Sequence, residues 1–190
     1  VPTHTEGKKK VCVVGGGVGC AIAYPVLKKF HDCGAEVHAV VGFKNKDVVI
    51  LEDKFKAVSS VLKVCTDDGS YGQKGLVTEA LKELLDEGNQ YDEIFAIGPM
   101  VMMKFVSLTT KPYGIPTTVS MSPIMIDGTG MCGGCRLTVG GETKFACVDG
   151  PDFDGHQVDW DLAVKRNQMY AEFEKHKHEE VCNLFRQEVK

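Results

Sequence analysis

The feature that most constrains this chain is a regular alternation of short β-branched runs with amphipathic segments across residues 10–121. Segments with helical spacing cover residues 20–30, 47–58, 77–85 and 100–108. The runs typical of buried strands cover residues 10–14, 36–41, 61–65, 93–97 and 117–121. Strands that alternate with helices predict an α/β fold with a doubly wound, parallel sheet of five strands.

Glycine-bearing loops follow the first, third and fourth predicted strands: 15–19, 66–72 and Gly98-Pro99. The carboxyl ends of parallel strands share one edge of the sheet, where ligands bind in such folds. Glycines at a helix N-terminus let a phosphate reach backbone N–H groups. The first loop departs from the dinucleotide fingerprint, because Cys20 takes its last glycine position and no acidic residue ends the second strand. Taken alone, this loop is a weak signal that leaves a ligand-free turn open as the lesser alternative.

Composition narrows the function classes. The formal charge is −4, the sequence pI is about 5.9 and the 22 basic residues are scattered, which argues against nucleic acid as a partner. No run of about 18 apolar residues is present, so no membrane span is predicted. The first ten residues do not resemble a signal peptide, so the eight cysteines indicate reduced thiols or metal ligands and a cytoplasmic location.

A second constellation lies in the glycine-rich stretch 126–148. Asp127, Cys132, Cys135 and Cys147 have the spacing Asp-x4-Cys-x2-Cys-x11-Cys. Plant-type [2Fe–2S] proteins use Cys-x4-Cys-x2-Cys and a distant fourth cysteine, here expected on a later strand. The pattern therefore predicts a [2Fe–2S] cluster with a carboxylate in place of the first thiolate. Because a carboxylate is the harder ligand, the potential should differ from that of an all-cysteine cluster.

Other interpretations of these thiols stay open. Cys132, Cys135 and Cys147, with Asp127 or His156, could form a structural zinc site, although only one Cys-x2-Cys knuckle is present. A redox disulfide between Cys132 and Cys135 lacks the flanking strand and helix of thioredoxin-like proteins. The remaining cysteines are predicted to be structural, and those in strands or helices to be small hydrophobic residues: Cys12, Cys20, Cys33, Cys65 and Cys182.

Three motifs carry a family resemblance. VVGGGVGCAIAYPVLK (13–28), TDDGSYGQKG (66–75) and AIGPMVMMK (96–104) resemble the ligand loops of the ferredoxin–NADP reductase superfamily. Residues 124–161 are similar to the small flavin-bearing subunits of NADH-dependent reduced ferredoxin:NADP oxidoreductases, also described as sulfide dehydrogenase beta subunits. That family is related to the electron-transfer subunit of dihydroorotate dehydrogenase B, whose cluster has four cysteine ligands. Asp127 favours the former.

The resemblance implies an NAD(P)(H) site without a general acid or base. The pyrophosphate is expected on the first loop, the ribose and nicotinamide near the second, and the third beside the nicotinamide. The implied residues are Gly16, Gly17, Val18 and Gly19; Thr66, Asp67, Asp68, Gly69 and Ser70; and Gly98, Pro99 and Met100. Cys20-Ala21 and Ile97 depart from the usual Ala-Pro pair and cysteine. Lys44 and Lys46 could meet a 2′-phosphate, but a solvated turn is the favoured interpretation, and the resemblance leans toward NAD(H).

The resemblance also implies a domain plan. Residues 1–9 would be a linker from a missing FAD-binding barrel, 10–120 the NAD(P)-binding domain, 121–160 the [2Fe–2S] domain and 161–190 a C-terminal helical segment. Electrons would pass between nicotinamide, FAD and cluster to a larger flavin and iron–sulfur partner subunit, and through it to ferredoxin. Without FAD the fragment should not turn over. A nucleotide-binding module with structural zinc, or a free-standing ferredoxin-like carrier, would be an alternative.

Two expectations concern the C-terminal third. Phe153 and Trp160 are expected to cover the cluster loop, and His176 and His178 to face solvent. An apolar stripe is expected to pack on the body or on the partner subunit, and its members are Tyr170, Phe173, Val181, Leu184 and Phe185.

Overall fold

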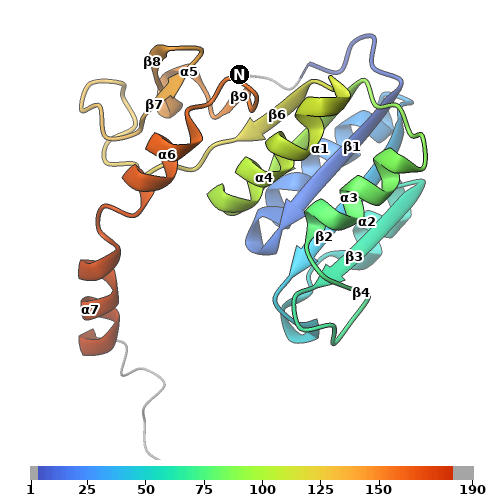
Figure 1. Cartoon of the computed structure of the whole chain (residues 1–190), viewed down its shortest axis with the longest axis horizontal. Coiled ribbons are helices and arrows are strands. Elements are labelled where there is room, and N and C mark those ends of the chain that lie inside the picture. Colours follow the sequence, from blue (N-terminus) through green and yellow to red (C-terminus); the bar gives the residue numbers. More distant parts are fainter. Residues whose placement is uncertain (1–3, 182–190) are drawn as a thin grey trace, which may run out of the picture.

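The computed structural model describes residues 4–181, and its centre is a twisted sheet (Figure 1). The five predicted strands lie in the order β3-β2-β1-β5-β6 and pair in parallel throughout. The doubly wound α/β fold is therefore confirmed. Their bounds are β1 (Lys10–Gly16), β2 (Glu36–Phe43), β3 (Val61–Thr66), β5 (Glu93–Ile97) and β6 (Thr117–Ser120).

Helices cover both faces because strand β1 is apolar on both. Val11 and Val13 belong to one buried cluster, which includes residues of α1 (Cys20–Asp32) and α2 (Glu52–Val58). Cys12 and Val14 belong to the other, which includes residues of α3 (Val77–Asp86) and α4 (Met100–Thr110). Burial on both faces is what a central parallel strand requires. Short 3-10 turns η1 (Gly17–Gly19) and η3 (Lys111–Tyr113) complete this part.

The sheet is wider than the five predicted strands. Strand β4 (Gln73–Lys74) pairs in parallel with β3, and β9 (Asp152–Asp154) pairs antiparallel with β6, with Val119 opposite Phe153. Both added strands are too short to give a periodic signal in the sequence. Strand β9 comes from the region after the cysteines, so that region contributes an edge strand to the main sheet.

The helix predicted over residues 47–58 begins only at Glu52, which corrects that prediction. The Asn45 side chain accepts a hydrogen bond from the Asp47 N–H at 3.1 Å and caps the 3-10 turn η2 (Lys46–Val48). Leu51 then has a φ of 61°, in the left-handed region that non-glycine residues rarely adopt. A continuous α-helix cannot pass through that conformation.

The cysteine region packs on the end of the sheet (Figure 1). Its hairpin is β7 (Arg136–Val139) with β8 (Glu142–Phe145), followed by the one-turn helix α5 (Ala146–Asp149) and then α6 (Trp160–Asn167). The Trp160 indole N–H donates to the Gly155 carbonyl at 2.9 Å, and Lys104 of α4 pairs with Asp161 at 2.6 Å. These contacts fix α6 against the body.

The last described helix, α7 (Ala171–Val181), extends away from the sheet (Figure 1). Tyr170 is 44% exposed and lines a cavity beside the cysteine loop, whereas Phe173 is 72% exposed. Packing of the stripe on a partner subunit stays a prediction, and the Val181 side chain lies outside the described part of the structure. Leu184, Phe185 and Cys182 lie outside the described residues. His176 and His178 are exposed, as predicted. Among residues 4–181, no helix has the length and apolar character needed to cross a bilayer.

Candidate functional site

A cavity of 390 Å³ lies at the carboxyl edge of the sheet, where the sequence predicts the nucleotide. It brings together four of the predicted residues: Gly16, Gly17, Asp67 and Pro99. Its walls also include residues that sequence reasoning missed, chiefly Phe43, Leu76, Val77, Val101, Met102 and Phe105. These side chains are apolar, and in the sequence nothing separates them from core residues. The cavity is therefore lined by glycine backbone, apolar side chains and one acidic side chain.

Two predicted glycines are needed for the close approach of neighbouring turns. A Cβ atom at Gly19 would lie 2.6 Å from the Ile97 carbonyl oxygen and 2.7 Å from the Gly98 Cα. Likewise, a Cβ at Gly16 would lie 2.5 Å from the Met102 sulfur. The loops after β1 and β5 are thus in backbone contact. This packing accounts for Gly19 without any ligand, whereas Gly16 and Gly17 line the cavity.

The loop after β3 is held by its own side chains. The Thr66 hydroxyl is buried, donates to the Tyr71 carbonyl at 2.6 Å and accepts from the Tyr71 N–H at 3.1 Å. Asp68 accepts from the Ser70 hydroxyl at 2.6 Å and from the Ser70 N–H at 2.9 Å, and these bonds lower the pKa of its carboxyl. Of these predicted contacts, Asp67 alone is among the residues that line the cavity in the described part of the chain.

The remaining predicted nucleotide residues lie near the cavity but do not line it. Val18 is exposed, Met100 is buried in the core, and Gly98 and Gly69 belong to the adjoining turns. Lys44 lines the cavity, whereas the Lys46 ammonium lies 5.8 Å from the centre of the Tyr71 ring and borders a neighbouring hollow.

In the cysteine region, Asp127 and Cys132 form one pair. The Asp127 carboxylate accepts from the Thr129 N–H at 2.7 Å and from the Thr129 hydroxyl at 2.9 Å. These bonds lower the pKa of the Asp127 carboxyl, and a hydrogen bond from the Cys132 thiol adds to the effect. The Cys132 sulfur in turn accepts from the Gly134 N–H at 3.3 Å.

Cys135 and Cys147 form a second pair. Cys135 is buried just before β7, and Cys147 lies on the one-turn helix α5, not on a strand as predicted. The Ala146 N–H donates to the Cys135 carbonyl at 3.2 Å and draws the two segments together. Desolvation and the neighbouring Cys135 thiol raise the pKa of Cys147, and the Gly130 N–H lowers it.

The arrangement in pairs bears on the kind of metal that would fit. Within residues 4–181, no three side chains of histidine, cysteine, aspartate or glutamate converge on one point. A structural zinc ion needs four such ligands around a single centre. The His156 imidazole shares a hydrogen bond of 2.9 Å with the Thr110 hydroxyl. Two separate pairs could supply two protein ligands to each atom of a centre with two metal atoms.

The other cysteines differ in their surroundings. Burial raises the pKa of Cys12 and Cys20 to about 12 and that of Cys65 to about 11, which keeps these thiols protonated and unreactive. They are small core residues, as predicted. Cys33 is exposed at the end of α1, 3.6 Å from the Thr5 hydroxyl, so its predicted role as a core residue is wrong.

Phe153 and Trp160 cover only part of this region. Both are buried in the cluster of apolar side chains that contains Cys135. Ile126 and Met131 of the preceding loop are 70% and 88% exposed, so the expected cover over the whole loop is absent among the described residues. The aromatic rings protect the Cys135 side and leave the Cys132 side open.

Comparison with known proteins shows which family the cysteine region belongs to. Residues 122–159 match the family model of the iron–sulfur cluster binding domain of dihydroorotate dehydrogenase B. The chain therefore contains an iron–sulfur cluster binding domain of that type. The match includes Asp127, Cys132, Cys135 and Cys147.

Similar proteins extend the match over the sheet. A dihydroorotate dehydrogenase B electron transfer subunit homolog of Thermotoga maritima is 49% identical over 178 residues, which are 94% of this chain and 62% of that protein. A probable electron transfer subunit of that enzyme from Methanocaldococcus jannaschii is 40% identical over 149 residues, 78% of this chain and 56% of that protein.

Among solved structures, a chain of the NADH-dependent reduced ferredoxin–NADP oxidoreductase, from a study of flavin-based electron bifurcation, superposes with a TM-score of 0.85. It is 48% identical, and the match covers 95% of this chain and 64% of that one. This protein is a homologue of that oxidoreductase chain and of the electron transfer subunits of dihydroorotate dehydrogenase B. It spans about three-fifths of the length of these relatives.

Proposed function

We propose that this chain is the nucleotide- and cluster-binding part of an electron-transfer subunit in a flavin and iron–sulfur oxidoreductase. The observation that carries the proposal is the pairing of Asp127 with Cys132 and of Cys135 with Cys147. Both pairs lie in the segment that matches an iron–sulfur cluster binding domain. They come from a loop whose backbone N–H groups point at sulfur, as in cluster sites.

The donor set fits a [2Fe–2S] cluster with Asp127, Cys132, Cys135 and Cys147 as ligands. Three thiols and a carboxylate with a lowered pKa offer the anionic ligands that iron needs. The N–H groups of Gly134 and Gly130 would donate to the sulfurs of Cys132 and Cys147 and stabilise their negative charge.

The cavity at the sheet edge would bind NAD(P)(H). Gly16 and Gly17 present backbone to the pyrophosphate, and the apolar walls exclude water from the nicotinamide. When bound, the nicotinamide would supply two-electron hydride chemistry, FAD the conversion between two-electron and one-electron transfer, and the cluster one-electron chemistry. FAD would come from a flavin-binding domain of the whole protein. The contribution of this chain is positioning, without a general acid or base.

NAD(H) is the favoured nucleotide within this proposal. Asp67 lines the cavity, and the neighbouring Asp68 carboxyl has a lowered pKa and is ionised at neutral pH. Two carboxylates in this loop would repel a 2′-phosphate. Lys44, which also lines the cavity, would offset part of that repulsion.

The proposed partner is a larger subunit with flavin and iron–sulfur centres, through which electrons reach ferredoxin. This follows the oxidoreductase chain of 48% identity, and Asp127 in place of a fourth cysteine favours that type. A dihydroorotate dehydrogenase B partner is the second candidate, because the curated relatives have that name. Co-purification of the whole protein with each class of partner would separate the two. We place the whole protein in the cytoplasm, where free thiols stay reduced.

Anaerobic purification of the chain, with assays of iron, acid-labile sulfide and zinc and a visible spectrum, tests the cluster. Iron and sulfide in equal amounts, with visible absorbance, are expected. Zinc with neither iron nor sulfide would replace the proposal with a structural zinc module. A nucleotide-binding measurement by calorimetry with NADH and NADPH tests the cavity separately.

A further inference from the structure

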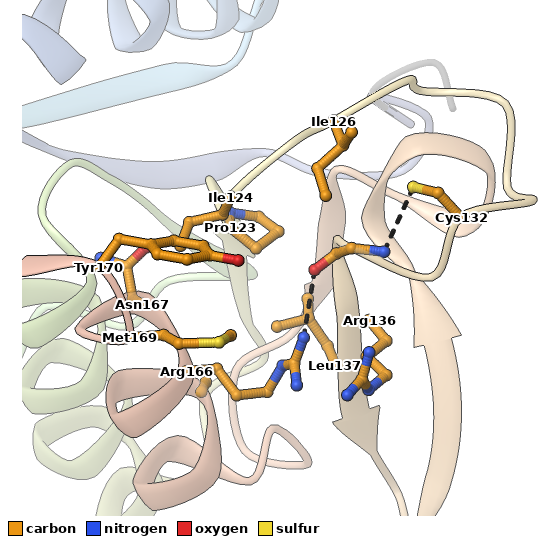
Figure 2. Close-up of a pocket in the computed structure, with 12 residues that line it drawn as sticks. Pro123, Ile124, Ile126, Cys132, Arg136, Leu137, Arg166, Asn167, Met169 and Tyr170 are labelled. Carbon is orange, nitrogen blue, oxygen red and sulfur yellow. Dashed lines mark hydrogen bonds between the residues drawn. The ribbon is translucent and has the colours of Figure 1, made fainter. Parts of the chain in front are cut away.

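Two arginines approach the backbone between Cys132 and Cys135 from different elements. The Arg136 guanidinium, at the start of β7, donates to the Gly133 carbonyl at 3.0 Å. The Arg166 guanidinium, on α6, donates to the Gly134 carbonyl at 3.2 Å. Figure 2 shows Arg166 reaching from α6 across the cavity to this backbone, with the Cys132 sulfur on the far side of Gly134.

The hydrogen bond from Arg136 to the Gly133 carbonyl affects a second hydrogen bond, from the Gly134 N–H to the Cys132 sulfur, because both involve the same peptide group. The Gly133 carbonyl and the Gly134 N–H belong to the same planar peptide. That N–H donates to the Cys132 sulfur at 3.3 Å. A cation on the carbonyl end of a peptide polarises it and makes its N–H a stronger donor. Arg136 therefore strengthens the donor that faces Cys132.

Arg166 holds the next peptide, which joins Gly134 to Cys135. The Asp159 carboxylate caps its helix by accepting from the Leu162 N–H at 3.0 Å, and the buried Trp160 packs the helix on the body. The guanidinium is thus delivered from a fixed element, and it lines a cavity of 260 Å³ beside the loop. A side chain at Gly134 would crowd its neighbours, since a Cβ would lie 3.0 Å from Ile126 Cδ1 and 3.4 Å from the Cys132 sulfur.

The charges of both arginines remain uncompensated by carboxylates. Across residues 4–181, neither guanidinium has an aspartate or glutamate oxygen within salt-bridge distance. Their hydrogen bonds to the Gly133 and Gly134 carbonyls are thus the polar contacts found for the two guanidinium groups in the described residues, and they direct both positive charges at the loop. A positive charge and a strengthened N–H donor both stabilise an additional electron on a nearby iron–sulfur centre.

We propose that Arg136 and Arg166 are positioning residues that hold the Gly133-Gly134 backbone against the Cys132 and Cys135 ligands and raise the reduction potential of the centre. The inference rests on the proposed cluster. It assigns to residues outside the ligand set the function of tuning the potential through two adjacent peptides.

The test compares Arg136→Gln and Arg166→Gln with Lys165→Gln in the full 190-residue chain. Lys165 is exposed on the same helix as Arg166, and no hydrogen bond or salt bridge to the loop is found for it in the described structure. Removal of its charge therefore matches the change in net charge without touching the loop. The readouts are iron and sulfide per chain and the midpoint potential from a redox titration followed by electron paramagnetic resonance.

Both arginine variants should shift the midpoint to a more negative potential than Lys165→Gln does, and Arg166→Gln should also lose iron faster on dilution. Arg136→Lys and Arg166→Lys, which keep the charge, should lie between parent and glutamine variants. If the glutamine variants retain no cluster while Lys165→Gln does, the positioning role is supported, and the lysine variants then report the potential. Midpoints and iron loss equal to those of Lys165→Gln would overturn the inference. A parent chain without iron and sulfide would instead remove the proposed function, and this inference with it.

Discussion

The Cys147 thiol on α5 lies beside the buried Cys135 thiol at the start of the β7–β8 hairpin. The hairpin turns the chain back so that these two residues meet. Asp127 and Cys132 form their pair within one loop, without the hairpin. The two halves of the proposed centre thus depend on different structural elements, and substitutions can separate them.

Cys147→Ser should remove most of the iron and sulfide, because a serine hydroxyl is a poor substitute for a thiolate ligand. The measurement is metal and sulfide content with the visible spectrum after anaerobic reconstitution. Cys33→Ser is the matched control, since Cys33 is an exposed free cysteine outside the pairs. Equal loss in both variants would show that general thiol chemistry, and not ligation, is being measured.

Gly19→Ala should destabilise the fold by about 2 kcal/mol, because a Cβ there overlaps the backbone of Ile97 and Gly98. Separation of the two turns should also weaken NADH binding. Chemical denaturation and calorimetry measure the two effects. Ala21→Ser, at an exposed position of α1, serves as control and should stay within about 0.5 kcal/mol of the parent. An unchanged stability of Gly19→Ala would contradict the tight packing of these turns.

Asp67→Asn should raise the affinity for NADPH relative to NADH. Removal of one charge interaction of about 1 kcal/mol corresponds to about a fivefold change in the ratio of dissociation constants. Titration with both nucleotides at one ionic strength gives the ratio. Asp47→Asn, an exposed carboxylate that does not line the cavity, controls for net charge. A ratio that moves equally in both variants would place Asp67 away from the ribose.

Because of His38, the free energy of unfolding should fall as the pH drops below about 6.5, the pKa of an unfolded histidine. Burial lowers the pKa of His38 in the folded chain, the Glu36 carboxylate raises it and Lys10 lowers it further. The His38 Nε2 atom lies 2.9 Å from the Glu36 carboxylate, and its Nδ1 atom lies 2.8 Å from the Tyr91 hydroxyl. The unfolded chain therefore takes up the proton first, so the stabilising contribution of neutral His38 is complete above that pH and is lost toward the folded pKa.

Chemical denaturation at a series of pH values measures how the free energy of unfolding changes with pH. His38→Gln should reduce this change with pH below about pH 6.5, the unfolded histidine pKa. His31→Gln, at an exposed position on α1, should leave it as in the parent. The same slope in parent and His38→Gln would assign the pH dependence to other groups.

Local patterns predicted the parallel sheet well, and the exceptions are instructive. The β-branched runs of β1, β2, β3, β5 and β6 are long enough to show strand character by themselves. The helix start at Glu52 was missed because it depends on a left-handed Leu51 that no residue preference signals. The exposed position of Cys33 was not predicted, because a free cysteine usually packs in the core as a small hydrophobic residue.

By itself the sequence determined the strand–helix alternation, the three loops at one sheet edge and the spacing of Asp127, Cys132, Cys135 and Cys147, because each is a property of neighbouring residues. Only the tertiary structure decided which groups meet. Contact between Cys135 and Cys147 needs the hairpin to close, β9 needs the edge of β6, and Arg166 reaches Gly134 only because α6 packs beside the loop. Such contacts join distant parts of the chain, and their geometry is set by packing that no local pattern encodes.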